Sequence, residues 1–163
     1  MFDKFGEMNS ADELNELATN FLKEGDKDSL KAMAEENGIP KEYAEMFIDG
    51  DIPFLTDPIT AANGKLDIES KELGLKGLMT DWVEYIRGLC MEKPEMAAAV
   101  RTKSKSLKEC MGKLLKYSFE NRVHVHEEIV KAAKISASRV DFGVPSMGEA
   151  KKMIREYYLE GTK

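Results

Sequence analysis

Apolar residues recur with a period close to 3.6 along nearly the whole chain, which is the pattern of amphipathic helices. Residues that begin or end helices bound each stretch. Ser10 with Glu13 forms a capping box, Gly25 is a left-handed helix stop, and Asp57-Pro58 is an N-cap followed by a first-turn proline. The pattern predicts helices over 10–25, 28–36, 40–49, 57–68, 78–90, 94–100, 106–119, 126–133 and 146–158.

Strand patterns are nearly absent. Only residues 139–144 offer a place for a short strand. The sequence therefore predicts an all-α protein, a compact bundle of about eight helices. We expect the following apolar side chains of two helices in the core: Leu78, Met79, Trp82, Val83, Ile86, Leu89 and Cys90, and Leu107, Cys110, Met111, Leu114, Leu115 and Phe119.

Charge divides the chain into two halves. The net charge is −6 over 163 residues, but residues 1–75 carry −11 and residues 76–163 carry +5. Gly74 and Gly77 mark a short break between the halves. We therefore expect two packed helical subdomains, an acidic one over 1–75 and a basic one over 76–163.

The composition favours a protein of the cytoplasm. Cys90 and Cys110 form no CxxC pair, and two thiols make no disulfide framework. No apolar run reaches the roughly 18 residues of a membrane helix. The first residues lack the positive and apolar regions of a secretory signal. We expect no membrane association, and the sequence leaves the oligomeric state open.

Two charged segments are candidates for partner binding. Basic residues crowd residues 101–122, where they could contact phosphates or an acidic protein surface. Acidic residues crowd the second helix of a possible helix-turn-helix over 30–47, and their charge would repel DNA. The candidate residues are Arg101, Lys103, Lys105, Lys108, Lys113 and Lys116, and Glu42, Glu45 and Asp49.

No arrangement predicts catalysis. Phosphate-binding and nucleophile motifs are absent from the sequence. His124 and His126 are the only histidines and could supply two zinc ligands, but no third histidine exists. Cys110 with His124 is a conceivable nucleophile pair, although Cys110 lies on an apolar stripe. We expect no enzyme, no cofactor and no metal site.

Residues 82–160 resemble the PcfK-like family of accessory proteins carried on conjugative and other mobile elements. The resemblance lies in three patterns, although an added N-terminal half and an insertion over 135–147 depart from it. The residues are Ala97, Val100, Lys105, Ser106, Leu107, Lys108 and Cys110, then Val125, Ile129 and Val130, then Tyr157 and Tyr158.

Some relatives in that family are anti-CRISPR proteins, inhibitors of the type II RNA-guided DNA nuclease. The resemblance implies a non-enzymatic inhibitor or accessory factor with a protein partner, such as that nuclease. The alternative is a nucleic-acid-binding regulator of conjugative transfer that uses the basic 101–122 helix.

Overall fold

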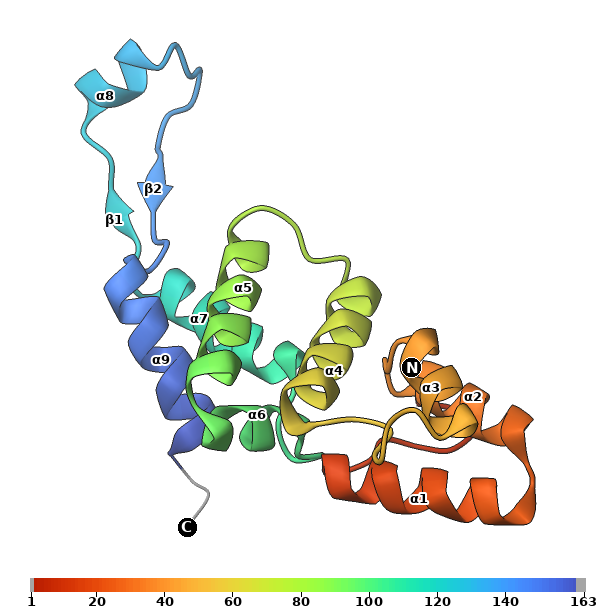
Figure 1. Cartoon of the computed structure of the whole chain (residues 1–163). Coiled ribbons are helices and arrows are strands. Elements are labelled where there is room, and N and C mark those ends of the chain that lie inside the picture. The colour runs from red at the N-terminus through yellow and green to blue at the C-terminus, as the bar shows by residue number, and fades with distance from the viewer. Residues whose placement is uncertain (1, 161–163) are drawn as a thin grey trace.

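A computed structural model of the chain describes residues 2–160 and consists, over that range, of nine helices and two short strands (Figure 1). This arrangement confirms the all-α class. The elements are α1 (Ala11–Glu24), α2 (Lys27–Glu36), α3 (Lys41–Asp49), α4 (Pro58–Leu73), α5 (Leu78–Glu92), α6 (Pro94–Arg101), α7 (Leu107–Glu120), β1 (Val123–His124), α8 (Glu127–Ala132), β2 (Asp141–Phe142) and α9 (Met147–Leu159).

The predicted boundaries are close to the observed ones. Ser10 accepts a hydrogen bond from the Glu13 N–H, and Gly25 closes α1 with φ 75°. α4 runs five residues past the expected end at Ile68, because only Gly74, with φ 59°, stops it. The strand expected within 139–144 is β2, which pairs antiparallel with β1.

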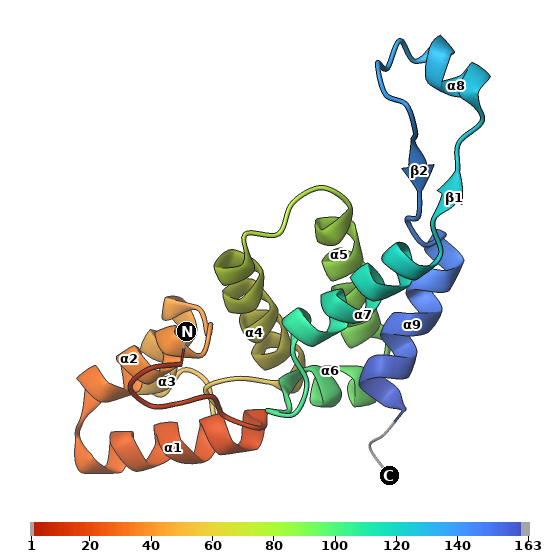
Figure 2. The same cartoon turned by 180° about the vertical axis from the view of Figure 1, so that it is seen from behind.

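The buried side chains form two clusters. One lies among α1, α2, α3 and the start of α4, and the other among α4, α5, α6, α7 and α9. Ala61 belongs to the first cluster and Ala62 to the second. The division therefore falls at the beginning of α4 and not at residue 75, because most of α4 packs with the C-terminal helices (Figure 2). We call residues 2–57 the N-terminal unit.

Two glycines bring the N-terminal unit against α4. A Cβ atom on Gly64 would lie 2.5 Å from the Gly38 carbonyl oxygen, and one on Gly38 would lie 2.6 Å from the Gly64 Cα. Gly38 also has φ 74°, a conformation that other residues adopt at a cost. Only glycine at both positions allows this backbone contact.

Some residues expected in the core lie at the surface. Leu115 is 69% exposed and Phe119 is 65% exposed, although Leu107, Cys110, Met111 and Leu114 of the same helix are buried. The apolar stripe of α7 is wider than the surface that α4 and α9 cover. Leu78 and Met79, at the start of α5, are also more than one-third exposed.

The glycine contact gives a stability prediction. We expect Gly64→Ala to lower the free energy of unfolding by about 2 kcal/mol or more, because the added methyl group meets backbone that is itself in a tight turn. The matched control is Gly112→Ala in α7, where a Cβ atom meets nothing within 4 Å. The control should raise the stability by about 0.5–1 kcal/mol. Urea unfolding measures both, and equal effects of the two substitutions would contradict the close contact.

Candidate binding surfaces

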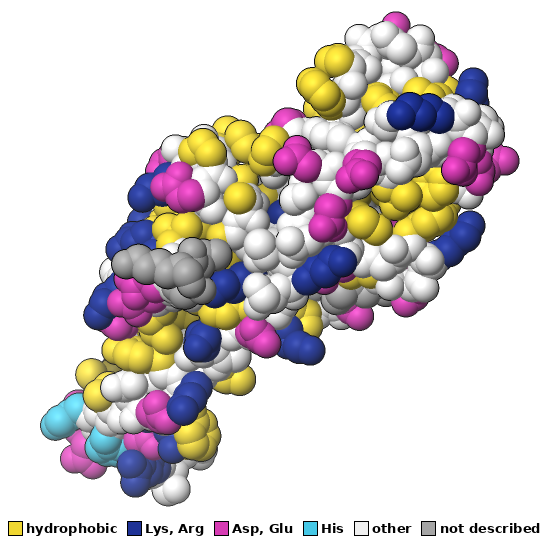
Figure 3. Space-filling view, turned by 90° about the horizontal axis from the view of Figure 1, so that it is seen from below, with side chains coloured by type: hydrophobic (Ala, Val, Ile, Leu, Met, Phe, Trp, Pro, Cys, Tyr) yellow, Lys and Arg dark blue, Asp and Glu magenta, His cyan; other side chains and the backbone are white. Residues whose placement is uncertain are grey.

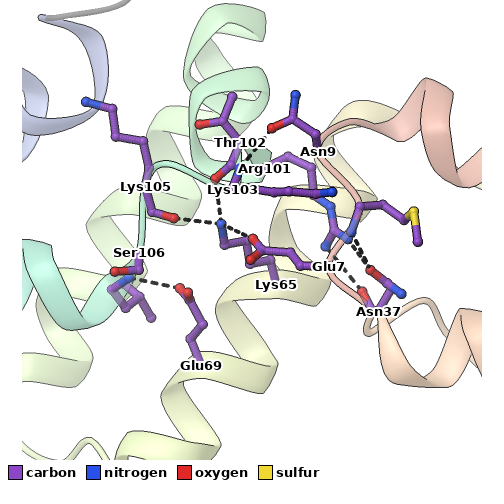
Figure 4. A network of polar contacts seen from close by, with 12 residues as sticks. Glu7, Asn9, Asn37, Lys65, Glu69, Arg101, Thr102, Lys103, Lys105 and Ser106 are labelled. Atoms are coloured by element: carbon purple, nitrogen blue, oxygen red, sulfur yellow. Dashed lines mark hydrogen bonds and ion pairs between the residues drawn. The ribbon is translucent and has the colours of Figure 1, made fainter. Parts of the chain in front are cut away.

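Arg101 is not a surface residue, so its assignment as a partner contact is wrong. Its side chain is 1% exposed and lies between α4 and the end of α2 (Figure 4). The guanidinium donates to the side-chain oxygen of Asn37, and to the carbonyl oxygens of Asn37 at 3.5 Å and Ala61 at 3.4 Å. Burial lowers the pKa of Arg101 to about 10, against the opposing field of Glu7 and Glu69, so the group stays charged at neutral pH.

Lys65 of α4 is a second buried cation, also 1% exposed. Its ammonium group donates to the carbonyl oxygens of Thr102 and Lys105, each at 2.7 Å, and pairs with Glu7 at 2.5 Å. These bonds attach the segment between α6 and α7 to α4 (Figure 4). We call Glu7, Asn37, Lys65, Glu69 and Arg101 the junction.

Glu69 completes the junction one turn further along α4. Its carboxylate accepts from the Leu107 N–H at 2.9 Å, at the start of α7. Desolvation raises the pKa of Glu69, although this hydrogen bond and the charge of Lys65 act in the other direction. The junction therefore holds two cations and two acids where the two clusters meet, and their mutual contacts fix the geometry of the helices around them.

The N-terminal segment is attached to the same place. The carboxylate of Glu36 accepts from the N–H groups of Lys4, Phe5 and Gly6 at 3.0–3.2 Å. Asn37 accepts from the Met8 N–H at 3.2 Å and donates to the Met33 carbonyl. Asn37 therefore has a structural role at the end of α2.

The remaining basic candidates lie on or just before α7, where acidic groups balance them. Lys105, Lys113 and Lys116 line a groove of about 650 Å³ between α7 and α9 together with four carboxylates, those of Glu109, Glu120, Glu156 and Glu160. Lys105 donates to the Tyr157 carbonyl oxygen, and Lys116 pairs with Glu120 at 3.7 Å. Lys103 and Lys108 are exposed. Within this groove the carboxylates therefore balance the charge of the lysines.

The acidic candidates lie on α3. Glu42 and Asp49 are exposed, and Glu45 pairs with Lys41 at 3.5 Å and Lys31 at 3.8 Å. α3 and α7 lie in different parts of the molecule in both views (Figures 1 and 2), so the two sets of candidates do not form one site. Exposed ion pairs of this kind contribute little to stability.

A hollow next to α3 combines apolar and acidic groups. It measures about 490 Å³ and lies between α1 and the segment over residues 51–58, with Tyr43 of α3 at one side. Asn15 of α1 fixes that segment by exchanging two hydrogen bonds of 3.0 Å with the backbone of Thr56. Leu55 then points into the core and is fully buried, whereas Phe54 is 65% exposed.

The electrostatics of this hollow are negative. Asp12 and Asp57 are part of its lining, and the unit around it carries 15 acidic and 5 basic residues over positions 1–57. Partial burial alone would raise the pKa of Asp57, but hydrogen bonds from Thr60 and Ile59 outweigh it and lower the pKa. Figure 3 shows acidic and apolar side chains side by side over this part of the molecule. We call this feature the Phe54 hollow.

The structure brings no reactive groups together among the residues it describes. Burial raises the pKa of the Cys90 thiol to about 11 and that of Cys110 to about 12, so both stay protonated at neutral pH. His124 faces Asp141 at 3.4 Å in an exposed segment, away from buried Cys110. The Nδ1 atom of His126 caps α8. Within residues 2–160, no three metal-binding side chains gather at one point.

Comparison of this chain with known proteins finds no similar protein. No family model, curated protein or solved structure matches this chain. The resemblance of residues 82–160 to the PcfK-like family therefore stays a prediction. Among the described residues, no helix is long and apolar enough to cross a bilayer. The class that the structure defines is an all-α protein.

Sequence analysis did not identify Phe54 as a candidate. A usable signal was present, because Ile52-Pro53-Phe54-Leu55 places three apolar residues between two helices without helical spacing. The side chains of such a run can be buried in a core or remain exposed. The Asn15–Thr56 hydrogen bonds fix the backbone so that Leu55 is buried and Phe54 is exposed.

The raised pKa of Glu69 gives a prediction on pH. A carboxyl group whose pKa is higher in the folded state contributes stability at low pH and loses it as the pH rises through the folded pKa. Gln at this position keeps an acceptor for the Leu107 N–H but does not ionise. We therefore expect the unfolding free energy of Glu69→Gln, relative to the native protein, to be greater at pH 7 than at pH 4. Urea titrations at the two pH values measure this, and an equal difference at both would contradict the raised pKa.

Proposed function

We propose that this chain is a non-enzymatic binding protein whose Phe54 hollow docks on a basic surface of a macromolecular partner. The observation that carries the proposal is an aromatic ring that is 65% exposed and lines a hollow of about 490 Å³ in a strongly acidic unit. Aromatic anchors in pockets dominate the energy of many protein interfaces.

The charges around the hollow support a basic partner. Asp12 and Asp57 are exposed in the lining of the hollow beside its apolar residues, an arrangement in which charge directs the encounter and the apolar contact supplies affinity. Proteins that hold nucleic acid have basic grooves of the opposite sign. A nucleic-acid-handling protein is therefore the class of partner that fits.

Two observations support a binding role over an enzymatic one. Both thiols are buried and protonated at neutral pH, and the two histidines have separate structural partners. The charged side chains that are buried belong to the junction, where they hold the helices in place. Nucleic-acid binding through residues 101–122 has less support, because four carboxylates share the groove with three of the lysines.

The exposed Phe54 side chain should contribute much of the affinity for the partner. We expect Phe54→Ala to weaken partner binding about 30-fold, the loss of roughly 2 kcal/mol typical of a central interface aromatic. Its stability should change little, because the ring is mostly exposed. The matched control is Met91→Ala on α5, which removes an apolar side chain that is 72% exposed in the other part of the molecule.

Affinity capture from the native host measures this effect, with the native chain, Phe54→Ala and Met91→Ala each used as bait. A partner retained by the native chain and by Met91→Ala, but lost with Phe54→Ala, is the expected result. Capture should also weaken as salt concentration rises, because part of the attraction is between charges. Equal recovery with all three proteins would show that the hollow is not the docking site.

One candidate partner of the proposed class is the type II RNA-guided DNA nuclease. The resemblance to mobile-element accessory proteins, together with the basic channel of RNA-guided nucleases, makes the type II nuclease the first to test. We expect the chain to block DNA cleavage by the guide-loaded nuclease near a one-to-one ratio, and Phe54→Ala to require a large excess. Full cleavage in the presence of excess native chain would exclude this nuclease as the partner.

A further inference from the structure

Residues 121–144 form an arm that leaves the body of the molecule between α7 and α9 (Figures 1 and 2). No residue of the arm is buried, and α8 at its tip contributes nothing to either core. Its two strands pair Val123 with Phe142 and His124 with Asp141, and one more backbone hydrogen bond joins Val125 to Val140. A two-stranded ribbon is marginally stable by itself in water, and both of its outer edges are free to pair.

The base of the arm is nevertheless fixed to the body. A Cβ atom on Gly143 would lie 2.1 Å from the Ser118 carbonyl oxygen and 2.8 Å from Cγ of Arg122, so the returning strand lies directly against the end of α7. Arg122 donates to the Phe119 carbonyl oxygen and stacks 4.0 Å from the Phe119 ring. The arm therefore has a defined direction, and its outer part has no partner within the chain.

The arm exposes several large apolar side chains to solvent. Five of its 24 residues are large, apolar and 47–64% exposed. They are Val123, Ile129, Ile135, Phe142 and Val144. Val123 and Phe142 are opposite each other in the ladder, so their side chains share one face. Exposed apolar groups that gather in one segment mark a candidate interaction site.

Charge along the tip is arranged in two blocks. Glu127 and Glu128 form the first turn of α8, Ile129 follows at 62% exposure, and Lys131 and Lys134 lie at and just beyond its end. Lys134 has a left-handed backbone, with φ 56°, that ends the helix. The pairs of Lys131 with Glu128 at 2.7 Å and Glu127 at 3.8 Å are exposed, so they contribute little by themselves.

We propose that the arm joins two copies of this chain, with the two α8 helices packed antiparallel about a twofold axis beside Ile129. That symmetry places Glu127 and Glu128 of one copy against Lys131 and Lys134 of the other, so the charges of the two tips are complementary. The arm as a whole carries +1, with four basic and three acidic residues, so two arms repel each other little.

The charges of the arm favour a second copy over a nucleic acid. A nucleic acid fits less well, because Glu127, Glu128 and Asp141 would face its phosphates. Figure 3 shows apolar, basic and acidic side chains together on the arm.

The charge blocks allow a decisive experiment. One variant carries Glu127→Lys and Glu128→Lys, and the other carries Lys131→Glu and Lys134→Glu. Each tip then has a single sign, so like charges face each other across the axis and each variant alone should associate at least tenfold more weakly than the native chain. An equimolar mixture should restore association to near the native level, because the two tips are then opposite in sign. Sedimentation equilibrium at low and high salt measures the masses.

The mixture is the control for folding, because damage to α8 within one chain would not be repaired by adding the other. Ile129→Asp in the native background should abolish association, and Leu73→Asp, at an exposed site on α4, should not. A native chain that stays monomeric at its highest attainable concentration would overturn the proposal. So would a mixture that associates no better than either variant. Neither result affects the Phe54 hollow, which lies at the other end of the molecule (Figure 1).

Discussion

Contact between the backbones of Gly38 and Gly64 forces α4 against the turn that joins α2 and α3. That close approach leaves Arg101 and Lys65 between the two clusters of buried side chains, where water does not reach them. Burying two cations costs several kcal/mol each unless acceptors surround them. The carbonyl oxygens of Asn37, Ala61, Thr102 and Lys105 supply those acceptors. Of these residues only Asn37 belongs to the N-terminal unit, so the glycine contact brings it within reach of Arg101.

The buried charged residues also fix the position of α7. Glu69 holds the first N–H of α7, and Lys65 holds the carbonyl group of Lys105 just before it. The phenol group of Tyr157 accepts from the Ser106 N–H and donates to Glu109, so α9 is bound to the beginning of the same helix. The junction and Tyr157 together thus position the segment after α6, α7 and α9. They also position the groove between α7 and α9, in which acidic and basic side chains balance each other.

A rigid body of this kind can present surface at two places far apart. The Phe54 hollow lies on the acidic N-terminal unit, and the arm extends from the opposite end (Figures 1 and 2). If two chains associate through their arms, the assembly carries two hollows at once. Two linked weak sites bind a repeated or symmetric partner far more tightly than one, provided that the spacing fits. Docking at the Phe54 hollow and association through the arm rest on different observations, and both can occur in one assembly.

Local patterns determined the helices, because spacing of apolar residues and capping residues such as Ser10 and Gly25 act over one or two turns. The sequence by itself was sufficient for the all-α class and for most helix boundaries. It misjudged Arg101 as a surface contact and Leu115 as a core residue, since burial depends on which neighbour covers a helix face. Phe54 and the charge balance of the groove were settled only by the tertiary structure, because they arise from segments distant along the chain, such as Asn15 with Thr56 and Lys116 with Glu160. Periodicity describes one helix at a time, whereas a binding surface is a property of how several helices are brought together.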